Sequence, residues 1–447
     1  MQNDYWVAVV GAGPAGIFAA RELALQNVKV VLINRDIKPG GLAEYGIYPD
    51  KHNMKEGLRF QFRKVLAMEN IHYLGNLRVG QNGDLSLAEL KNAGFQAVLV
   101  TAGAQGTKWL GLEGEQFVGV YHAKDLVYHY NRLPPFSQHT FRIGQRVAVI
   151  GAGNVSLDIV HYLASLPKVQ QAIAVIRRGP AEVKFDRREL EYVARSLDKD
   201  DLEAELQRVT PAMAALGQNP DDFRTFMGSA LEKAAPLTTK THFLLRFLVS
   251  PTRILGDQNL QVCGLEVEDN LLVRENAEDN GEVKARPSGS RRVLDVDTVI
   301  FAIGDRVDDA LGLPVTGNEF DKNPSPLFPI DGLSYESYDR KAGKPIGGIF
   351  VAGWSREASR GLVGVARRDG TMAAHAVLQY LDTQAPSPVS ALEKLQERIC
   401  VNGCFAISNV ELAKLEAVEQ MRAKMLGVEE FKFATNPEML KAIGEVQ

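Results

Sequence analysis

The chain has 447 residues, of which 45% are hydrophobic and 24% are charged. This is ordinary globular composition, and the length is enough for about two to four domains. The net charge of −4 at neutral pH argues against partners that are bound through overall positive charge. We therefore expect no nucleic acid and no membrane among its partners.

The start of the chain and its cysteines predict a cytoplasmic protein. The first predicted strand begins after about four residues, which leaves no room for a signal peptide, and no apolar run reaches the roughly 18 residues of a membrane span. Cys263, Cys400 and Cys404 are too few for a disulfide framework, so we expect reduced thiols. No spacing of His, Cys, Asp or Glu predicts a metal site.

A glycine-rich turn follows the first predicted strand, residues 6–10. A helix comes next, and a second strand follows at 28–33. Glycines in this context let the backbone approach a pyrophosphate at a helix N-terminus, so we predict an FAD site here. Its candidate residues in the turn are Gly11, Gly13, Pro14, Ala15 and Gly16.

Asn34 stands at the end of the second strand, where an acidic residue usually accepts from the ribose hydroxyls. An amide can still bind a hydroxyl without charge, and Asp36 lies close by. We therefore expect Asn34 to make a weakened contact with the FAD ribose. His52, in a loop before a predicted helix at 54–69, is a candidate catalytic residue over the flavin.

Two apolar strands end in similar glycine turns, one at Gly103 and one at Gly304. They resemble two linkers between a discontinuous domain and a domain inserted into it. We predict an FAD-binding domain of residues 1–103 and 305–447, and an NADP-binding domain of residues 104–304.

A strand at 348–352 is expected to rejoin the first domain, and a helix at 370–380 to close it. Gly353 and Trp354 follow this strand, and we expect Trp354 to flank the flavin. Gly361, Leu362 and Val363 lie where a helix N-terminus could meet the flavin ring.

A second glycine-rich turn begins about 140 residues after the first. It follows a predicted strand at 146–150 and carries Gly151 and Gly153. The next strand ends at Arg177 and Arg178, where the 2′-phosphate of NADP would sit. A hydrogen bond to a charged group contributes about 1.5 to 3 kcal/mol, so one arginine could favour NADP over NAD about tenfold. Glu189, on the following helix, could accept from the cofactor.

The rest of the chain carries no further candidate site residues. A charged helical stretch at 186–233 precedes strands at 242–273 and an exposed hairpin or loop at 275–292. A linker at 384–390 leads to a C-terminal helical extension within 390–447. We predict two helices there, one starting at Ser408 and one at Asn436.

Two nucleotides in one enzyme suggest a tightly held flavin and an exchangeable nicotinamide. The chain carries the motifs GAGPAG at 11–16, Gly41-Leu42 with Tyr45-Gly46 and Pro49-Asp50, GAGNVSLD at 151–158, IRRGP at 176–180 with Phe185 and Glu189-Leu190, LLRFLVSP at 244–251, Gly353-Trp354 and NPEMLKAIG at 436–444. With these motifs it resembles the adrenodoxin-reductase-type ferredoxin–NADP reductases over nearly its whole length.

The resemblance implies an α/β fold of two Rossmann-like domains, with the NADP domain inserted into a discontinuous FAD domain. It implies hydride transfer from NADPH to flavin, and single electrons passed to a ferredoxin-like or flavodoxin-like carrier. Gly41 and Leu42 would join the FAD site.

By position in the same family, Asn154 and Val155 would touch the NADP pyrophosphate, and Arg177 and Arg178 the 2′-phosphate. Glu189 and Gly361 would border the nicotinamide. A basic surface for an acidic ferredoxin has four candidates, Arg187, Arg188, Arg246 and Arg253.

Three departures from the family pattern stand out. Asn34 replaces the acidic ribose ligand, Lys51-His52 replaces a histidine directly after Pro-Asp, and the run from Trp354 to Gly361 replaces Trp-x-Lys-Arg-Gly-Pro-Thr-Gly. Glu357 inverts a charge in that run.

Two alternatives stay open. One is an electron-delivering subunit similar to the glutamate synthase small subunit, which should carry N-terminal cysteines that this sequence lacks. The other is a non-catalytic nucleotide-binding regulator, which Asn34 and the altered run at 355–360 would favour. The oligomeric state is not predicted.

Overall fold

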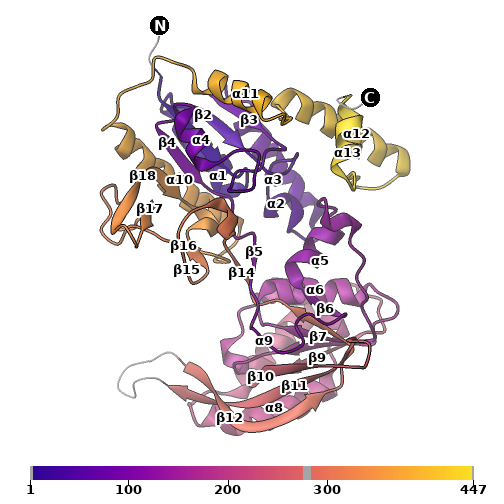
Figure 1. The fold of residues 1–447 in the computed structure, drawn as a ribbon. Helices are drawn as coiled ribbons and strands as arrows, with labels where there is room; N and C mark the ends of the chain where they lie inside the picture. Colours follow the sequence, from indigo (N-terminus) through magenta and orange to yellow (C-terminus); the bar gives the residue numbers. More distant parts are fainter. Residues whose placement is uncertain (1–3, 275–282, 445–447) are drawn as a thin grey trace. The chain divides into compact units, whose positions relative to one another are not determined.

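The computed structural model describes residues 4–274 and 283–444, and these form two compact units (Figure 1). The first unit comprises Met1–Lys108, Tyr128–Gln138 and Gly304–Gln447. The second comprises Trp109–Val127 and His139–Ile303. The first unit is therefore discontinuous, and the second is inserted into it.

The first unit is built on a six-stranded sheet in the order β17-β18-β4-β1-β2-β3. All neighbouring strands run parallel except the antiparallel pair of β17 and β18. β1 and β4 are buried along their whole length, as expected for a sheet covered on both faces. The strands are β1 (Trp6–Val10), β2 (Lys29–Ile33), β3 (Ile71–Leu74), β4 (Ala97–Val100), β17 (Glu336–Asp339) and β18 (Lys344–Val351).

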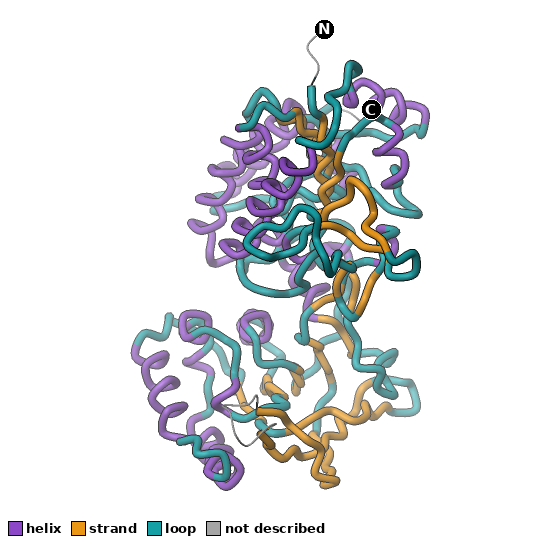
Figure 2. The backbone as a smooth tube through the Cα atoms, turned by 90° about the vertical axis from the view of Figure 1, so that its left-hand side faces the viewer, coloured by secondary structure: helices purple, strands orange, loops and turns teal. Residues whose placement is uncertain are grey.

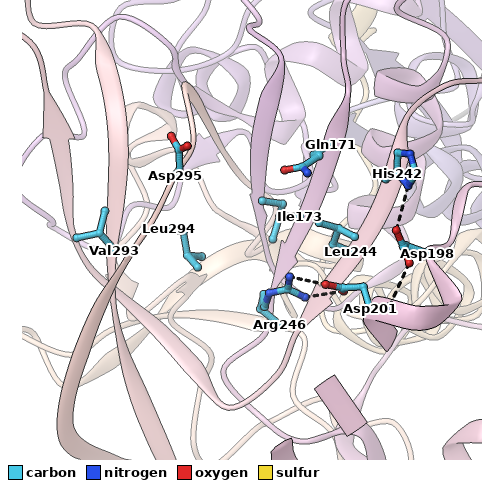
Figure 3. A pocket seen from close by; sticks show the side chains of 10 residues that line it. All are labelled: Gln171, Ile173, Asp198, Asp201, His242, Leu244, Arg246, Val293, Leu294 and Asp295. Atoms are coloured by element: carbon cyan, nitrogen blue, oxygen red, sulfur yellow. Dashed lines mark hydrogen bonds and ion pairs between the residues drawn. The ribbon is translucent and has the colours of Figure 1, made fainter. Parts of the chain in front are cut away.

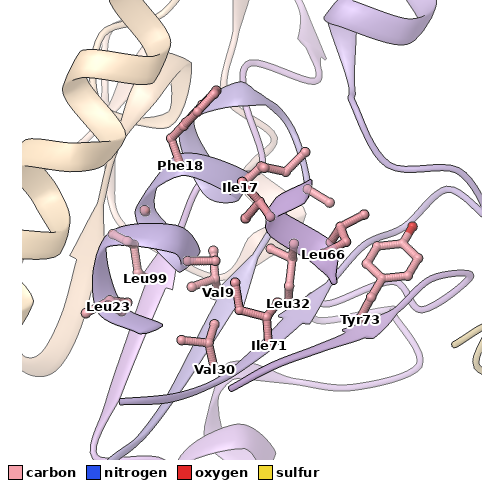
Figure 4. Close-up of a cluster of buried hydrophobic side chains, with 14 of the residues drawn as sticks. Val9, Ile17, Phe18, Leu23, Val30, Leu32, Leu66, Ile71, Tyr73 and Leu99 are labelled. Carbon is pink, nitrogen blue, oxygen red and sulfur yellow. The ribbon is translucent and has the colours of Figure 1, made fainter. Parts of the chain in front are cut away.

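Apolar side chains cover both faces of this sheet. On one face Val9, Val30 and Leu32 pack with Ile17 and Phe18 of α1 (Pro14–Leu25), as Figure 4 shows. On the other face the cluster includes alternate strand residues and side chains of α4 (Leu87–Asn92) and α11 (Ala391–Val401). The remaining elements of the first unit are α2 (Leu42–Tyr45), α3 (His52–Leu66), β5 (Gly106–Thr107), β14 (Asp305–Arg306), β15 (Val315–Thr316), β16 (Glu319–Phe320), α10 (Val363–Leu381), α12 (Asn409–Leu426) and α13 (Asn436–Ile443).

Several helices differ from the sequence-based expectation. α10 begins at Val363 rather than near residue 370. α3 begins at His52, so this residue is helical and not part of a loop. α11 was not predicted, although the Ser390 side chain accepts from the Glu393 N–H as an N-cap, because Ser390 had been assigned to the Pro- and Ser-bearing linker.

The second unit is built on a parallel sheet of five strands in the order β6-β13-β7-β8-β9. An antiparallel sheet of three strands, β10-β11-β12, belongs to the same unit. The helices and strands of the units can be followed in Figure 2. The strands are β6 (Val120–His122), β7 (Arg146–Ile150), β8 (Gln171–Val175), β9 (His242–Arg246), β10 (Val249–Gly256), β11 (Val262–Arg274), β12 (Val283–Leu294) and β13 (Thr298–Phe301).

The predicted helical stretch at 186–233 consists of three helices, α7 (Arg187–Glu191), α8 (Lys199–Ala214) and α9 (Pro220–Glu232). α6 (Asn154–Ala164) follows β7, and α5 (Ala123–Tyr130) spans a boundary between the units. Of the expected hairpin or loop at 275–292, residues 283–292 belong to strand β12, and 275–282 lie outside the described residues.

The segment Tyr128–Gln138 lies in the first unit, although the sequence placed it within the NADP-binding domain. Its contacts explain the difference. Tyr128 and Leu133 form a small apolar cluster with Tyr45, and Asn131 Oδ1 accepts from Lys55 Nζ at 3.0 Å. These partners come from residues far away in the sequence, so no local pattern indicated them.

A buried ion network joins the loop at 38–45 to α3 and to the C-terminal extension. The Glu44 carboxylate is 3% exposed and accepts from Arg59 twice at 2.7 Å. Lys432 Nζ lies 2.9 Å from Glu44 Oε1, and Lys38 Nζ lies 3.5 Å from the same oxygen. Lys38 also donates to Glu419 of α12 at 2.5 Å.

The electrostatics of this network follow from its burial. Burial alone would raise the pKa of the Glu44 carboxyl, but Lys432, Lys38 and Arg59 hold that pKa well below its ordinary value. At Lys55 the effect of burial prevails. Together with the charge of Lys432, burial lowers the pKa of the Lys55 ammonium group to about 8. Glu44 is thus ionised, and buried ion pairs hold the C-terminal extension in place.

We expect Glu44→Gln to lower the free energy of unfolding by about 3 to 5 kcal/mol, because it leaves buried cations uncompensated. The matched control is Glu56→Gln, since Glu56 also pairs with Arg59 but its side chain is 41% exposed. That variant should lose less than about 1 kcal/mol. Urea unfolding of both variants measures the difference, and equal losses would contradict the role of burial.

Lys55 should make stability depend on alkaline pH. Its pKa of about 8 in the folded chain lies below the ordinary value of 10.5, so between these values the unfolded chain binds the proton and the folded chain does not. The contribution of Lys55 to the free energy of unfolding therefore rises with pH over this window, by at most about 1.4 kcal/mol per pH unit.

The measurement is the difference in unfolding free energy between the wild type and Lys55→Met at about pH 7.5, 9 and 10. These pH values lie below, within and near the top of this window. The difference should shift in favour of the wild type as pH rises. Lys64→Met, at an exposed lysine of the same helix, should show no such shift. A pH-independent difference at Lys55 would show that this lysine keeps its ordinary pKa.

Candidate dinucleotide-binding sites

The first glycine turn lies at the carboxyl end of β1, between β4 and β2. Gly11 N–H donates to Ile33 O at 2.7 Å, which fastens the turn to the end of β2. A Cβ on Gly16 would lie 1.9 Å from Gly11 O, so only glycine permits the turn to pack against the start of α1. Ligands of parallel α/β sheets bind at this end of the strands.

The N-terminus of α1 has the features of an anion site. Gly13 is the N-cap and provides no side-chain acceptor for the first N–H groups, and Pro14 occupies the first turn. A Cβ built on Gly13 meets no protein atom within 4 Å, so the backbone there borders open space. The turn therefore fits the pyrophosphate of a dinucleotide.

The predicted FAD residues Gly41 and Gly353 lie beside this turn. Gly40 N–H donates to Ala12 O at 2.7 Å, and a Cβ on Gly41 would lie 3.2 Å from the Cα of Gly13. A Cβ on Gly353 would lie 2.8 Å from the Cβ of Ala15. The structure thus brings together the glycine turn and the segments around Gly41 and Gly353, which are far apart in the sequence. Gly103 adds a fourth segment, because Ser355 joins it to the 353–361 loop.

Asn34 has a structural role that the sequence did not indicate. It is 7% exposed, its Oδ1 accepts from Ala12 N–H at 3.0 Å, and its Nδ2 donates to Asp36 O and Lys38 O at 2.9 and 3.0 Å. The side chain therefore fastens the glycine turn to the loop after β2. Because the amide oxygen can accept a second hydrogen bond, the expected contact of Asn34 with the FAD ribose stays a prediction.

The loop at 353–361 is held by Asp369 of α10, for which the sequence indicated no contact with this loop. Asp369 Oδ2 accepts from Gly353 N–H at 2.6 Å, and Oδ1 accepts from Arg356 Nη2 at 2.6 Å. Trp354 is half-buried and donates from Nε1 to Arg360 O at 3.0 Å. The Arg368-Asp369-Gly370 run was visible in the sequence, but its partners 13 and 16 residues upstream were not.

Glu357 does not leave an isolated negative charge in this loop. Its carboxylate lies 2.9 Å from Arg356 Nη2 and 2.9 Å from Arg360 Nη1. Two arginines thus compensate the inverted charge. Gly361 precedes the N-terminus of α10, where the N-cap Leu362 makes no side-chain hydrogen bond and leaves the first N–H groups, including that of Val363, available to a carbonyl acceptor.

His52 is the first residue of α3 and lines a small pocket with Arg59, Glu419 and Glu430. Arg59 and Glu419 belong to the network described above, and Glu430 Oε2 lies 3.5 Å from Lys55 Nζ. The Nδ1 atom of His52 is buried and has no hydrogen-bond partner. The expectation that His52 lies in a loop is therefore wrong, and its expected place over the flavin stays a prediction.

The second glycine turn repeats the geometry of the first in the second unit. Gly151 N–H donates to Val175 O at 3.1 Å, which joins the turn to the end of β8. Gly153 is the N-cap of α6 without a side-chain hydrogen bond, and a Cβ on it would meet no atom within 4 Å. This turn also fits a pyrophosphate.

Asn154 contributes to this site through its backbone. Its side chain is occupied by Asp186, because Asn154 Nδ2 donates to Asp186 Oδ2 at 2.8 Å and Asp186 N–H donates to Asn154 Oδ1 at 2.7 Å. Lys184 N–H also donates to Ala152 O at 2.9 Å. The segment before α7 therefore folds against the turn, and Val155, 44% exposed, stays at its surface.

Arg177 and Arg178 follow the end of β8 after Ile176, and β8 lies next in the sheet to β7, the strand that carries the turn. Arg177 is exposed, and its carbonyl accepts from Asn270 Nδ2 at 3.0 Å, which fixes its backbone. Glu189 lies in α7, three residues after Asp186. Glu189 belongs to the second unit and Gly361 to the first.

A polar pocket of the second unit lies apart from these residues (Figure 3). Gln171 and His242, the first residues of β8 and β9, line it, and none of the predicted NADP residues does. Its charged side chains are paired, since Arg246 binds both oxygens of Asp201 at 2.7 Å and His242 Nδ1 lies 3.0 Å from Asp198 Oδ2. We do not assign it to the cofactor.

The described residues contain neither a candidate metal centre nor a membrane-spanning helix. Among residues 4–274 and 283–444, no group of His, Cys, Asp and Glu side chains could hold a metal ion. Within the same ranges, every helix is too short or too polar to span a membrane.

Relatives with known names resemble the chain over most of its length. It is 29% identical to the NADPH-ferredoxin reductase FprA of Mycobacterium tuberculosis, with 82% of each chain covered. It is 28% identical to the mitochondrial NADPH:adrenodoxin oxidoreductase of Salvelinus fontinalis, covering 97% of this chain and 90% of that protein. The resemblance to adrenodoxin-reductase-type reductases is confirmed.

A solved structure agrees in fold. M. tuberculosis FprA in complex with NADPH superposes with a TM-score of 0.80 at 24% identity, covering 98% of this chain and 99% of that one. The family model described as pyridine nucleotide-disulphide oxidoreductase matches residues 5–323. The chain is therefore an oxidoreductase that belongs to the pyridine nucleotide-disulphide oxidoreductase family.

Proposed function

We propose that the chain is an NADPH-dependent flavoprotein reductase, with FAD in the first unit and NADP in the second. It takes a hydride from NADPH onto flavin and passes single electrons to a ferredoxin-like or flavodoxin-like carrier. The observation that carries the proposal is the pair of glycine turns, each with an uncapped helix N-terminus and open space at Gly13 or Gly153. FAD supplies the redox chemistry when bound.

The chain's own part is to bind and orient. The N–H groups at the start of α1 would hold the FAD pyrophosphate, with Gly41 beside them, and those after Leu362 would meet the flavin ring. Trp354 would flank that ring, and the contacts of Asp369 with Gly353 and Arg356 would hold its loop in place. Hydride transfer then depends on position rather than on a side-chain base.

For NADP, the N–H groups of α6 would hold the pyrophosphate and the exposed guanidinium of Arg177 the 2′-phosphate, with Arg178 beside it. Glu189 and Gly361 are proposed for the nicotinamide side on the resemblance alone. The boundaries of the two nucleotide-binding domains are proposed at the limits of the two compact units.

The carrier is proposed from the resemblance and from relatives named for ferredoxin and adrenodoxin. The four arginines considered for a basic docking surface support it less. Arg187 pairs with Glu191, Arg246 with Asp201 and Arg253 with Glu266, so their charges are partly neutralised. Arg188 is exposed. A cytoplasmic location stays a prediction.

The regulator hypothesis loses both of its supports. Asn34 is explained by its hydrogen bonds within the turn, and Glu357 by its two arginine partners. Neither departure therefore needs a loss of turnover as its cause.

The two open glycine positions provide a reciprocal test. Gly13→Ala places a methyl group where the pyrophosphate would approach, without meeting protein, so the chain should fold but retain at least about tenfold less flavin. Gly153→Ala should keep its yellow colour but need at least about tenfold more NADPH for half-maximal reduction. Flavin absorbance and stopped-flow bleaching measure both. Full flavin content in Gly13→Ala would refute the assignment of this turn.

Arg177→Ala should weaken use of NADPH by about tenfold or more while leaving NADH unchanged, because only NADPH carries the 2′-phosphate. The measurement is kcat/KM for flavin reduction with each coenzyme. Arg195→Ala, at another exposed arginine of the second unit, should change neither value. If wild-type flavin is bleached equally well by NADH, or Arg177→Ala behaves as wild type, the NADP assignment is wrong.

A further inference from the structure

The chain crosses between the two units at four connections, of which the first follows Lys108 and the last precedes Gly304. At the first unit, these two connecting segments pair with each other as β5 and β14, with Thr107 opposite Asp305 and Gly106 opposite Arg306. All residues discussed below belong to the first unit. The first and the last connection between the units are therefore joined to each other within the first unit.

Both connections are hydrogen-bonded to one loop, residues 353–361. Ser355 Oγ accepts from Gly103 N–H at 3.0 Å and lies 3.3 Å from Gly103 O, to which it donates. Ser359 Oγ accepts from Asp305 N–H at 2.8 Å. One serine therefore holds the outgoing connection and the other holds the returning one.

The loop is a firm anchor for these bonds. Asp369 and Arg356 hold its first half, as described above. In its second half, Ala358 N–H donates to Glu319 Oε1 at 3.2 Å, and Lys322 Nζ donates to Arg356 O at 2.6 Å. Ser355 itself is fully buried.

Ser359 is in an unusual backbone conformation. Its φ is +57°, in the left-handed region that residues other than glycine seldom adopt. A Cβ on Gly304 would lie 3.2 Å from Ser359 Cβ and Oγ, so the serine packs closely against Gly304, the first residue of the last segment of the first unit. Such conformations persist where the surrounding contacts impose them.

We propose that Ser355 and Ser359 are positioning residues for hydride transfer, fastening the first and the last of the four inter-unit connections to the loop that borders the flavin. This rests on the proposed function, which places Trp354 and Gly361 of that loop beside the ring. Reacting atoms must be held at about 3 to 3.5 Å, and small displacements of a reactant slow the reaction strongly. The serines touch neither proposed pyrophosphate site, so they should affect the rate of reduction and not NADPH affinity.

The test is stopped-flow flavin reduction by NADPH in Ser355→Ala and Ser359→Ala holoenzymes. We expect the limiting rate to fall at least about fivefold, while the NADPH dissociation constant and flavin content stay within about twofold of wild type. Deuterium exchange at Gly103 and Asp305 should become at least about tenfold faster in the respective variant, because each amide loses its acceptor.

Two further variants separate the hydroxyl group from other causes. Ser359→Gly removes the hydroxyl and also the strain of a positive φ, so it should slow reduction as Ser359→Ala does. Ser337→Ala removes a fully buried hydroxyl of the same unit that has no hydrogen-bond partner, so it should leave the rate unchanged.

The outcomes are distinguishable. Wild-type limiting rates in both alanine variants would overturn the inference while leaving the proposed function intact. A slower rate that merely follows loss of flavin would also overturn it, because the serines would then hold the cofactor. Wild-type protein that NADPH does not bleach would instead overturn the proposed function.

Discussion

The Glu44 carboxylate lies out of contact with water, surrounded by Arg59, Lys38 and Lys432. Because a buried carboxylate is tolerated only with its cations in place, the loop at 38–45, α3 and the C-terminal extension must assemble together. That loop carries Gly40 and Gly41, which pack on the first glycine turn. The shape of the proposed FAD site therefore depends on charges contributed from near the end of the chain.

The sequence was sufficient for features that are local. A strand, a glycine turn and an uncapped helix follow one another within about 20 residues, so both turns could be recognised, and the discontinuous first unit followed from the similar turns at Gly103 and Gly304. α11 was missed although its N-cap signal was present, because the preceding linker composition was given more weight.

Features that depend on distant partners could not be predicted. Lys432 and Glu44 are 388 residues apart, and each reads in the sequence as an ordinary surface charge. At Asn34 the pattern likewise indicates a nearby ribose, but it does not show that the side chain also binds Ala12 N–H. The segment 128–138 was misplaced for the same reason, because its partner Lys55 lies elsewhere in the chain.

The departures from the family pattern are physically coherent. At Asn34 a neutral amide replaces a charge, and the amide both accepts from the turn and donates to the following loop, which a carboxylate could not do. At Glu357 an added carboxylate lies between two guanidinium groups, so the loop keeps its net positive charge. In both cases the substituted side chain strengthens the backbone frame of a proposed binding site. A chain that had lost its cofactors would have no such constraint on these residues, and this favours a functional reductase over a protein that merely retains the fold.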